Sequence, residues 1–205
     1  GLPAELRVRI HHSAEEGSMS VVSLASRQGA GVRSAMTLLA PLFEYPDEMY
    51  GARLDLARAS MDEVDEEAMT SLQRFANEIE ELDRGALEAT FTATFDLSPS
   101  CLPYVGAHLF EPESRDRARL MVGLRMVYRQ GGHDSGIELP DHIAEVLHFA
   151  PRFEDQDWID LIQLVLEPAS VKMARALEDS SNPYRHLISV VLRLCRIANL
   201  DGGES

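Results

Sequence analysis

Cysteine, long apolar runs and basic residues are all scarce in this chain of 205 residues, and each scarcity excludes a class of protein. The two cysteines, Cys101 and Cys195, lack the spacing of a metal site, and Cys195 falls within an apolar helical pattern typical of a buried thiol. No uncharged apolar run approaches the roughly 20 residues of a membrane-spanning helix. Lysine and arginine number 19 against 34 acidic residues, and the formal net charge of -15 repels nucleic acid and anionic membranes. We therefore expect no nucleic acid partner and no stable membrane insertion.

Familiar catalytic motifs are also missing. The chain has no phosphate-binding glycine loop, no nucleophile elbow and no His-Glu-x-x-His zinc helix. No stretch alternates between polar and apolar residues as a strand does, and no repeat stands out. Hydrophobic residues make up 45% of the chain, which is an ordinary share for a folded core. These features favour a globular protein without a sheet and without an obvious catalytic centre.

Helical periodicity runs from about Val32 to Ala198. Pro168 predicts a kink or break in one helix, and Asn182-Pro183 predicts a cap and first turn for the last one. We predict an all-α fold, a single-domain irregular helical bundle of about eight or more helices, spanning residues 19–205. Residues 1–18 resemble an expression tag or a disordered extension and are excluded from this prediction.

Two neighbouring stretches differ in character. The stretch from Asp96 to Pro112 is predicted to be a long irregular loop, and its aromatic residues indicate either a binding surface or a packed connector. The stretch that follows predicts a helix with Ala118, Met121, Leu124 and Tyr128 on its buried face. Its arginines are predicted to lie on a solvated face and to pair with the many carboxylates; these are Arg115, Arg119, Arg125 and Arg129.

The segment from Glu138 to His142 predicts the start of a helix. Pro140 suits the first helical position, and Asp141 would then lie in the first turn, facing water, near the positive end of the helix dipole. His142 would lie at the edge of the apolar face. The pattern fits an ordinary helix start with a polar first turn, and it also fits a functional pairing of carboxylate and imidazole.

One enzymatic alternative comes from the order of histidines and aspartates. Some all-α phosphohydrolases bind a divalent metal through a lone histidine, a His-Asp pair and a distant aspartate, and such a site activates water. His108, His133-Asp134 and either Asp157 or Asp160 occur in that order. The His-Asp pair is flanked by glycines, however, whereas metal ligands need rigid surroundings. We expect no bound metal and no catalytic residues.

Several segments together resemble one known family. They are Phe43–Asp47 (FEYPD), Tyr104–Phe110 (YVGAHLF), Tyr128–His133 (YRQGGH), Glu138–His142 (ELPDH) and Asn182–Tyr184 (NPY). In order and spacing they resemble the NarJ-type chaperones, the delta subunits of respiratory nitrate reductase, within the TorD/DmsD group of molybdoenzyme maturation chaperones. The resemblance extends from about Met36 to Leu194.

The resemblance implies a cytoplasmic, all-helical chaperone that carries no cofactor of its own, and we favour a monomer. Its partner would be the N-terminal segment of a catalytic subunit, which it would hold until the molybdenum cofactor is inserted. In the family, the region around the Asp-His element is implicated in partner binding. The expected peptide-binding residues are Glu138, Pro140, Asp141 and His142, with Tyr104 and Phe110 nearby. A helical adaptor with a different partner remains a further alternative.

Overall fold

The computed structural model describes residues 31–202, apart from residues 62, 134–135, 137 and 179–180. Residues 1–18, which resemble a tag, and Asp134 of the alternative metal site lie outside the described residues. Within the described part the chain is helical and has no strand, and the one ladder-type pairing is an isolated antiparallel bridge between Tyr104 and His142. The predicted all-α fold is confirmed, and the helices form a single domain.

The helices follow one another along the chain. Residues 31–39 are α-helical and continue into the 3-10 helix η1. The later elements, in chain order, are η1 (Ala40–Phe43), α2 (Tyr50–Met61), α3 (Glu66–Glu80), α4 (Arg84–Phe95), α5 (Val105–Leu109), α6 (Arg115–Gln130), α7 (Ile143–Phe149), η2 (Ala150–Arg152), α8 (Asp155–Leu161), η3 (Ile162–Leu166), α9 (Glu167–Ala176) and α10 (Tyr184–Gly202).

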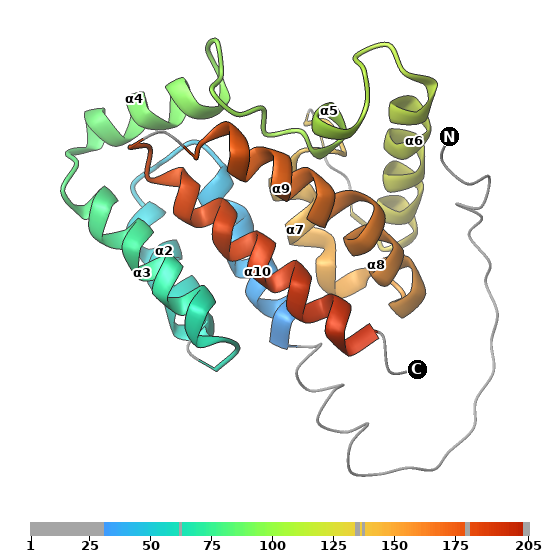
Figure 1. Cartoon of the computed structure of the whole chain (residues 1–205), viewed down its shortest axis with the longest axis horizontal. Helices are drawn as coiled ribbons and strands as arrows, with labels where there is room; N and C mark the ends of the chain where they lie inside the picture. The colour runs from blue at the N-terminus through green and yellow to red at the C-terminus, as the bar shows by residue number, and fades with distance from the viewer. Residues whose placement is uncertain (1–30, 62, 134–135, 137, 179–180, 203–205) are drawn as a thin grey trace.

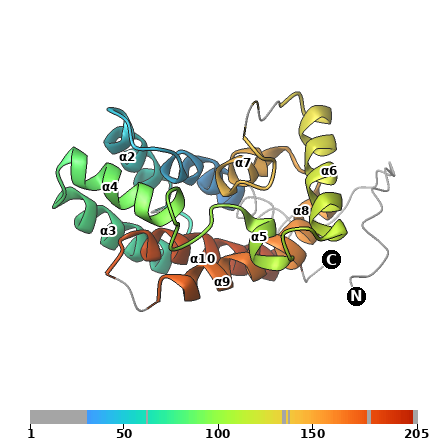
Figure 2. The same ribbon diagram turned by 90° about the horizontal axis from the view of Figure 1, so that it is seen from above.

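Helix α10 lies at the centre of the bundle, with α3 along one side and α9 along the other (Figure 1). Its first turn is capped by the Asn182 side chain, which accepts a hydrogen bond from the Tyr184 amide at 3.0 Å. The predicted cap at Asn182-Pro183 is therefore confirmed. The buried positions along α10 recur with helical spacing, as its apolar pattern predicts: Leu187, Ile188, Val191, Leu194 and Cys195. In the view from above, α2, α3 and α4 lie at one end of the molecule and α6 and α8 at the other (Figure 2).

An aromatic cluster fastens the α2–α4 end to α10. The Tyr184 ring contacts Phe75, Phe91 and Phe95, with ring centroids 4.9–6.0 Å apart. The buried hydroxyls of Tyr184 and Tyr50 lie 3.2 Å apart, so neither is left without a polar partner. These aromatic residues from separate helices therefore belong to the core.

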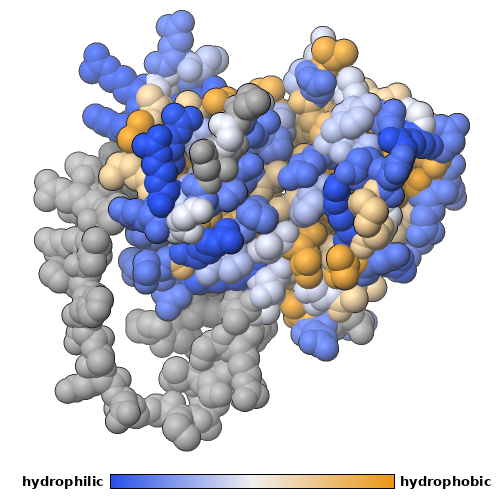
Figure 3. All heavy atoms as spheres, turned by 180° about the vertical axis from the view of Figure 1, so that it is seen from behind, coloured by the Kyte–Doolittle hydropathy of each residue, from blue (hydrophilic) through white to orange (hydrophobic). Residues whose placement is uncertain are grey.

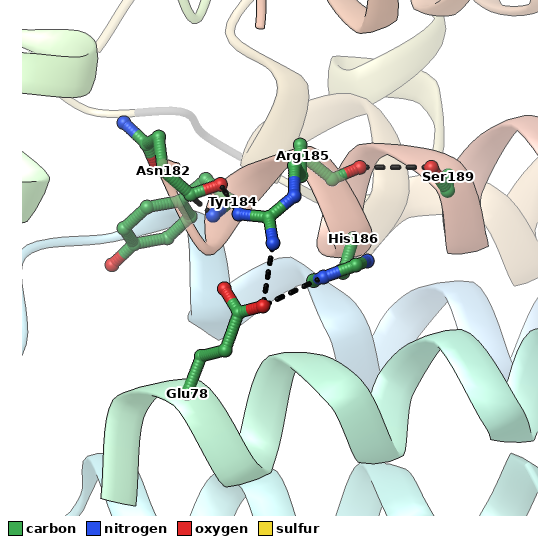
Figure 4. A network of polar contacts seen from close by, with 6 residues as sticks. All are labelled: Glu78, Asn182, Tyr184, Arg185, His186 and Ser189. Carbon is green, nitrogen blue, oxygen red and sulfur yellow. Dashed lines mark hydrogen bonds and ion pairs between the residues drawn. The ribbon is translucent and has the colours of Figure 1, made fainter. Parts of the chain in front are cut away.

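A polar contact on the surface supports the same packing. Glu78 on α3 accepts hydrogen bonds from Arg185 at 2.5 Å and from His186 at 3.0 Å, both on α10 (Figure 4). Asn182 contributes its backbone oxygen to Arg185 at 2.8 Å. The carboxylate thus accepts hydrogen bonds from two neighbouring side chains at the start of α10, and these contacts fix the register of α10 against α3.

The predicted irregularity near Pro168 is confirmed as a π-helical segment, η3, between α8 and α9. Proline has no amide hydrogen, so Pro168 cannot donate the bond that a regular helix would require. The helix continues through a wider π-helical turn instead of ending before Pro168. Ile162 and Leu166 in that turn are fully buried. Among the described helices, none is both long and apolar enough to cross a membrane.

Candidate functional site

Two of the five segments that carry the family resemblance, Tyr104–Phe110 and Glu138–His142, meet in the fold. The amide of Val105 donates to the carbonyl of Asp141 at 2.8 Å, and the amide of Ile143 donates to the carbonyl of Pro103 at 2.8 Å. These reciprocal bonds form the isolated bridge between Tyr104 and His142, whose rings meet edge to face with centroids 5.5 Å apart. The stretch Pro103–Val105 and the turn Glu138–Ile143 are therefore held together as one unit.

The predicted loop from Asp96 to Pro112 is only partly irregular, because it contains the short helix α5. The ring of His108, near the end of this helix, bonds the carbonyl of Leu102 at 2.8 Å. Lys172 on α9 donates to the carbonyl of His108 at 2.6 Å. These two bonds, one local and one from the distant helix α9, satisfy backbone carbonyls of a proline-rich stretch, which explains why a helical turn forms where the sequence pattern showed none.

The predicted start of the next helix is wrong by three residues. Helix α7 begins at Ile143, and His142 is its N-cap, with Nδ1 accepting a hydrogen bond from the Ala144 amide at 3.2 Å. Pro140 lies before the helix, and its carbonyl accepts a hydrogen bond from the buried hydroxyl of Tyr128 at 2.9 Å. The helix begins later than predicted because Tyr128 on α6 holds Pro140 in the preceding turn. The N-cap is then supplied by the imidazole of His142 instead of a carboxylate.

Asp141 is fully buried. The prediction that its side chain faces water in the first turn of the helix is therefore wrong. Its Oδ2 accepts hydrogen bonds from Arg117, at 3.3 Å from Nη2 and 3.4 Å from Nε. Its Oδ1 has no hydrogen-bond partner in the described part of the chain. A Cβ on Gly106 would lie 2.6 Å from Oδ2, so the carboxylate occupies the space that this glycine leaves open.

Arg117 is the residue that sequence reasoning missed. Arg117 does not belong to the four arginines that the pattern assigns to the solvated face, and it lies three residues before Leu120 and seven before Leu124, both of which are buried. The predicted buried face was shifted in part, because Ala118 is exposed and Leu120 takes its place in the core. The helical spacing from Arg117 to Leu120 and Leu124 is the sequence signal that places Arg117 beside the buried face of α6.

The rim of this unit remains accessible. Tyr104, Phe110 and Glu138 are half-buried. The Tyr104 hydroxyl donates to Glu138 Oε1 at 3.3 Å, and the same oxygen accepts the amide of Leu139 at 2.9 Å. Burial, followed by the negative charge of Glu138, raises the pKa of the Tyr104 hydroxyl, so the hydroxyl stays protonated at neutral pH. The rim thus offers a carboxylate next to aromatic surface.

His142 is held in its neutral form. Burial is the largest effect on its pKa and lowers it, while the carboxylates of Glu138, Glu145 and Asp141 act in the opposite direction. A lowered pKa agrees with the cap, because Nδ1 can accept a hydrogen bond only when it carries no proton. Of the six expected site residues, Asp141, Pro140 and His142 are buried, whereas Glu138, Tyr104 and Phe110 are half-buried.

The residues of the alternative metal site have other partners. His133 Nε2 lies 2.7 Å from Glu145 Oε2, and the ring of His108 is bound to a backbone carbonyl. Asp157 and Asp160 both lie on α8, and burial raises the pKa of Asp157. Across the residues that the structure describes, no three histidine, cysteine or acidic side chains are grouped so that they could hold a metal ion. The geometry therefore gives the hydrolase alternative no support.

Comparison with known proteins places this fold in a family. The structure is similar to the crystal structure of a protein from Archaeoglobus fulgidus assigned to redox enzyme maturation, with a TM-score of 0.56 and 20% sequence identity over 93% of this chain and 99% of that one. At this identity the likeness concerns the fold alone. No curated protein matches the chain significantly. A family model described as the nitrate reductase delta subunit matches residues 58–187, more than half of the chain, and the chain therefore belongs to that family.

Proposed function

We propose that this protein is a maturation chaperone for a molybdoenzyme, nitrate reductase or a related reductase. It acts in the cytoplasm as a monomer, binds the N-terminal segment of the catalytic subunit, and keeps that subunit competent for insertion of the molybdenum cofactor. The observation that carries this proposal is the family match, which spans the whole of the paired Tyr104 and Glu138–His142 unit. The protein contributes binding and no catalytic step.

The rim of the candidate site suits the chemistry of such a segment. N-terminal segments of this kind are basic and apolar, and a chain of net charge -15 attracts them. Glu138 supplies a carboxylate for a basic residue, while Phe110 and Tyr104 supply apolar surface. Exposed ion pairs contribute only about 0–1 kcal/mol each, so the apolar contacts dominate the affinity.

The buried members of the unit have a positioning role in this proposal. Asp141 binds Arg117 and cannot contact a peptide directly, because its side chain has no exposed surface. Pro140 accepts the Tyr128 hydroxyl, and His142 caps α7. Together they fix the turn that holds Glu138 beside Tyr104. A substitution at Asp141 therefore acts on peptide binding through the shape of the rim.

Calorimetric titration of the client's N-terminal peptide tests the proposal. We expect Phe110→Ala to weaken binding about tenfold, since truncating an aromatic contact at an interface often costs more than 1 kcal/mol. We expect Glu138→Gln to weaken it about two- to fivefold at low salt, and less at high salt because ions screen the exposed pair. Glu178→Gln is the matched control, as Glu178 is exposed near the end of α9.

The outcomes separate the alternatives. A wild-type protein that binds neither the peptide nor the complete catalytic subunit contradicts the chaperone proposal and favours an adaptor with another partner. Binding that Phe110→Ala and Glu138→Gln both leave unchanged, in variants that unfold like the wild type, keeps the chaperone but moves the peptide site elsewhere. Equal weakening by Glu178→Gln would show a general charge effect instead of a local contact.

A further inference from the structure

The outer face of helix α6 combines exposed arginines with two exposed apolar side chains. It stands at the edge of the molecule, at the end opposite α2–α4, in two perpendicular views (Figures 1 and 2). Val122 and Met126 lie one turn apart on this face, with 60% and 55% of their surface exposed. Hydrophobic side chains lie among hydrophilic ones over this end of the molecule (Figure 3). The outer face of α6 is formed by Arg115, Arg119, Val122, Arg125, Met126 and Arg129.

The arginines of the outer face are largely unpaired. Only Arg119 has a carboxylate within ion-pair distance, Asp116 at 3.1 Å, within the part of the chain that the structure describes. Arg115, Arg125 and Arg129 are exposed and make no ion pair with any described residue. The prediction that these arginines are solvated is confirmed, whereas the predicted pairing holds for one of the four.

The charge of α6 is opposite to that of the rest of the protein. Its sixteen residues hold five arginines and one aspartate, a formal charge of +4, in a chain of -15. Residues 44–96, which include α2–α4 at the other end of the molecule, hold 15 acidic and 4 basic residues, a formal charge of -11. The outer face of α6 is therefore a basic patch on an acidic protein, and it attracts acidic partners locally.

We propose that the outer face of α6 docks an acidic, partly apolar surface on the folded body of the catalytic subunit, apart from its N-terminal segment. This inference rests on the proposed function. Charge complementarity selects the occupant, since exposed arginines with no carboxylate partner favour an acidic surface. The apolar pair of Val122 and Met126 lies among these arginines, which resembles the central contact of a protein interface with its polar rim.

Other occupants fit the surface less well. An anionic membrane would meet two strongly exposed apolar side chains on this helix and a net charge of -15, which gives little insertion and an overall repulsion. A second copy of this chain could offer its acidic end, but each copy also repels the other through its net charge. One face of a helix about 24 Å long is small for a stable interface, so the contact acts together with the N-terminal segment, through effective concentration.

The test uses the catalytic subunit of the client molybdoenzyme, prepared without cofactor, in complete form and without its N-terminal segment. The variant Arg125→Glu/Arg129→Glu should bind the complete subunit about tenfold more weakly than wild type and show no measurable binding to the truncated one. Its affinity for the isolated N-terminal peptide should stay within about twofold. Salt should weaken binding of the truncated subunit to wild type, because the contact is electrostatic.

The matched control is Arg74→Glu compared with Arg125→Glu. Arg74 is exposed on α3, has no ion-pair partner among the described residues, and gives the same change in net charge at the opposite end of the protein. The control should bind the subunit like wild type. Binding of the α6 variants equal to that of wild type overturns the inference, and so does equal weakening by Arg74→Glu.

Further outcomes would also overturn the inference. If sedimentation shows that wild type self-associates and Arg125→Glu/Arg129→Glu does not, the outer face of α6 is assigned to a second copy of the chain. Flotation with anionic phospholipid vesicles that depends on the same arginines assigns it to a membrane. If the wild type binds the peptide but not the truncated subunit, the proposed α6 contact is contradicted and the proposed chaperone function stands. If it binds neither the peptide nor the complete subunit, both proposals are contradicted.

Discussion

The substitution Gly106→Ala tests whether the fold depends on the space that this glycine leaves for Asp141. A Cβ at position 106 would lie 2.6 Å from Asp141 Oδ2, 3.3 Å from Arg117 Cγ and 3.4 Å from Leu120 Cδ2. The first of these distances is well inside van der Waals contact. The carboxylate cannot move away freely, because it is fully buried and bound to Arg117. The ion pair or the position of α5 must therefore shift.

The expected cost follows from opposing terms. Overpacking of a buried site costs about 1–3 kcal/mol, and loss of freedom in the unfolded chain on replacing glycine by alanine returns about 0.4–1 kcal/mol. We expect Gly106→Ala to lower the free energy of unfolding by about 0.5–2 kcal/mol. Removing the obstructing carboxylate should relieve the clash, so the effects of Gly106→Ala and Asp141→Ala should be non-additive by about 1 kcal/mol or more.

Gly123→Ala is the control for Gly106→Ala. Gly123 lies inside α6, and a Cβ at that position would meet no atom within 4 Å. Alanine is favoured over glycine in a helix by about 1 kcal/mol, so this variant should be more stable than wild type. The measurement is urea unfolding followed by circular dichroism, with stability compared at an unchanged m-value. If Gly106→Ala proved as stable as Gly123→Ala, the close packing of Gly106 on Asp141 would be refuted.

Two further predictions concern titratable groups. His142 has a lowered pKa in the folded protein, so the unfolded chain binds more protons and stability falls as the pH drops below about 6.5. His142→Asn keeps a capping side chain without the titration, and its loss of stability between pH 7.5 and 5.5 should be smaller, by up to about 1 kcal/mol; equal pH profiles would contradict the neutral imidazole cap. Burial raises the pKa of Cys101 to about 12 and that of Cys195 well above its ordinary value, so a thiol reagent at pH 8 should label neither in the folded protein and both in urea. Rapid labelling without denaturant would show that the thiols are accessible.

The helices with strong periodicity could be predicted from sequence because their signals are local. The cap at Asn182-Pro183 and the irregularity at Pro168 depend on the backbone chemistry of the residues themselves, and both are confirmed. Helix α5 could not be predicted in this way. It is five residues long, and its backbone is held partly by Lys172, which lies 64 residues away from His108 in the chain. No local pattern contains a contact of that kind.

Asp141 shows the same limit more sharply, and it changes what the segment means for function. A short acidic residue after Pro140 predicts a solvated first turn, because an isolated charge is costly to bury. The burial becomes possible only because Arg117 and the space beside Gly106 come from two other elements, α6 and α5. A residue placed in this way cannot recognise a client by direct contact. Its removal should disturb the turn first and peptide binding second, whereas Glu138 and Phe110 at the rim should affect binding with little change in stability. Measuring stability and affinity on the same variants would separate these two roles.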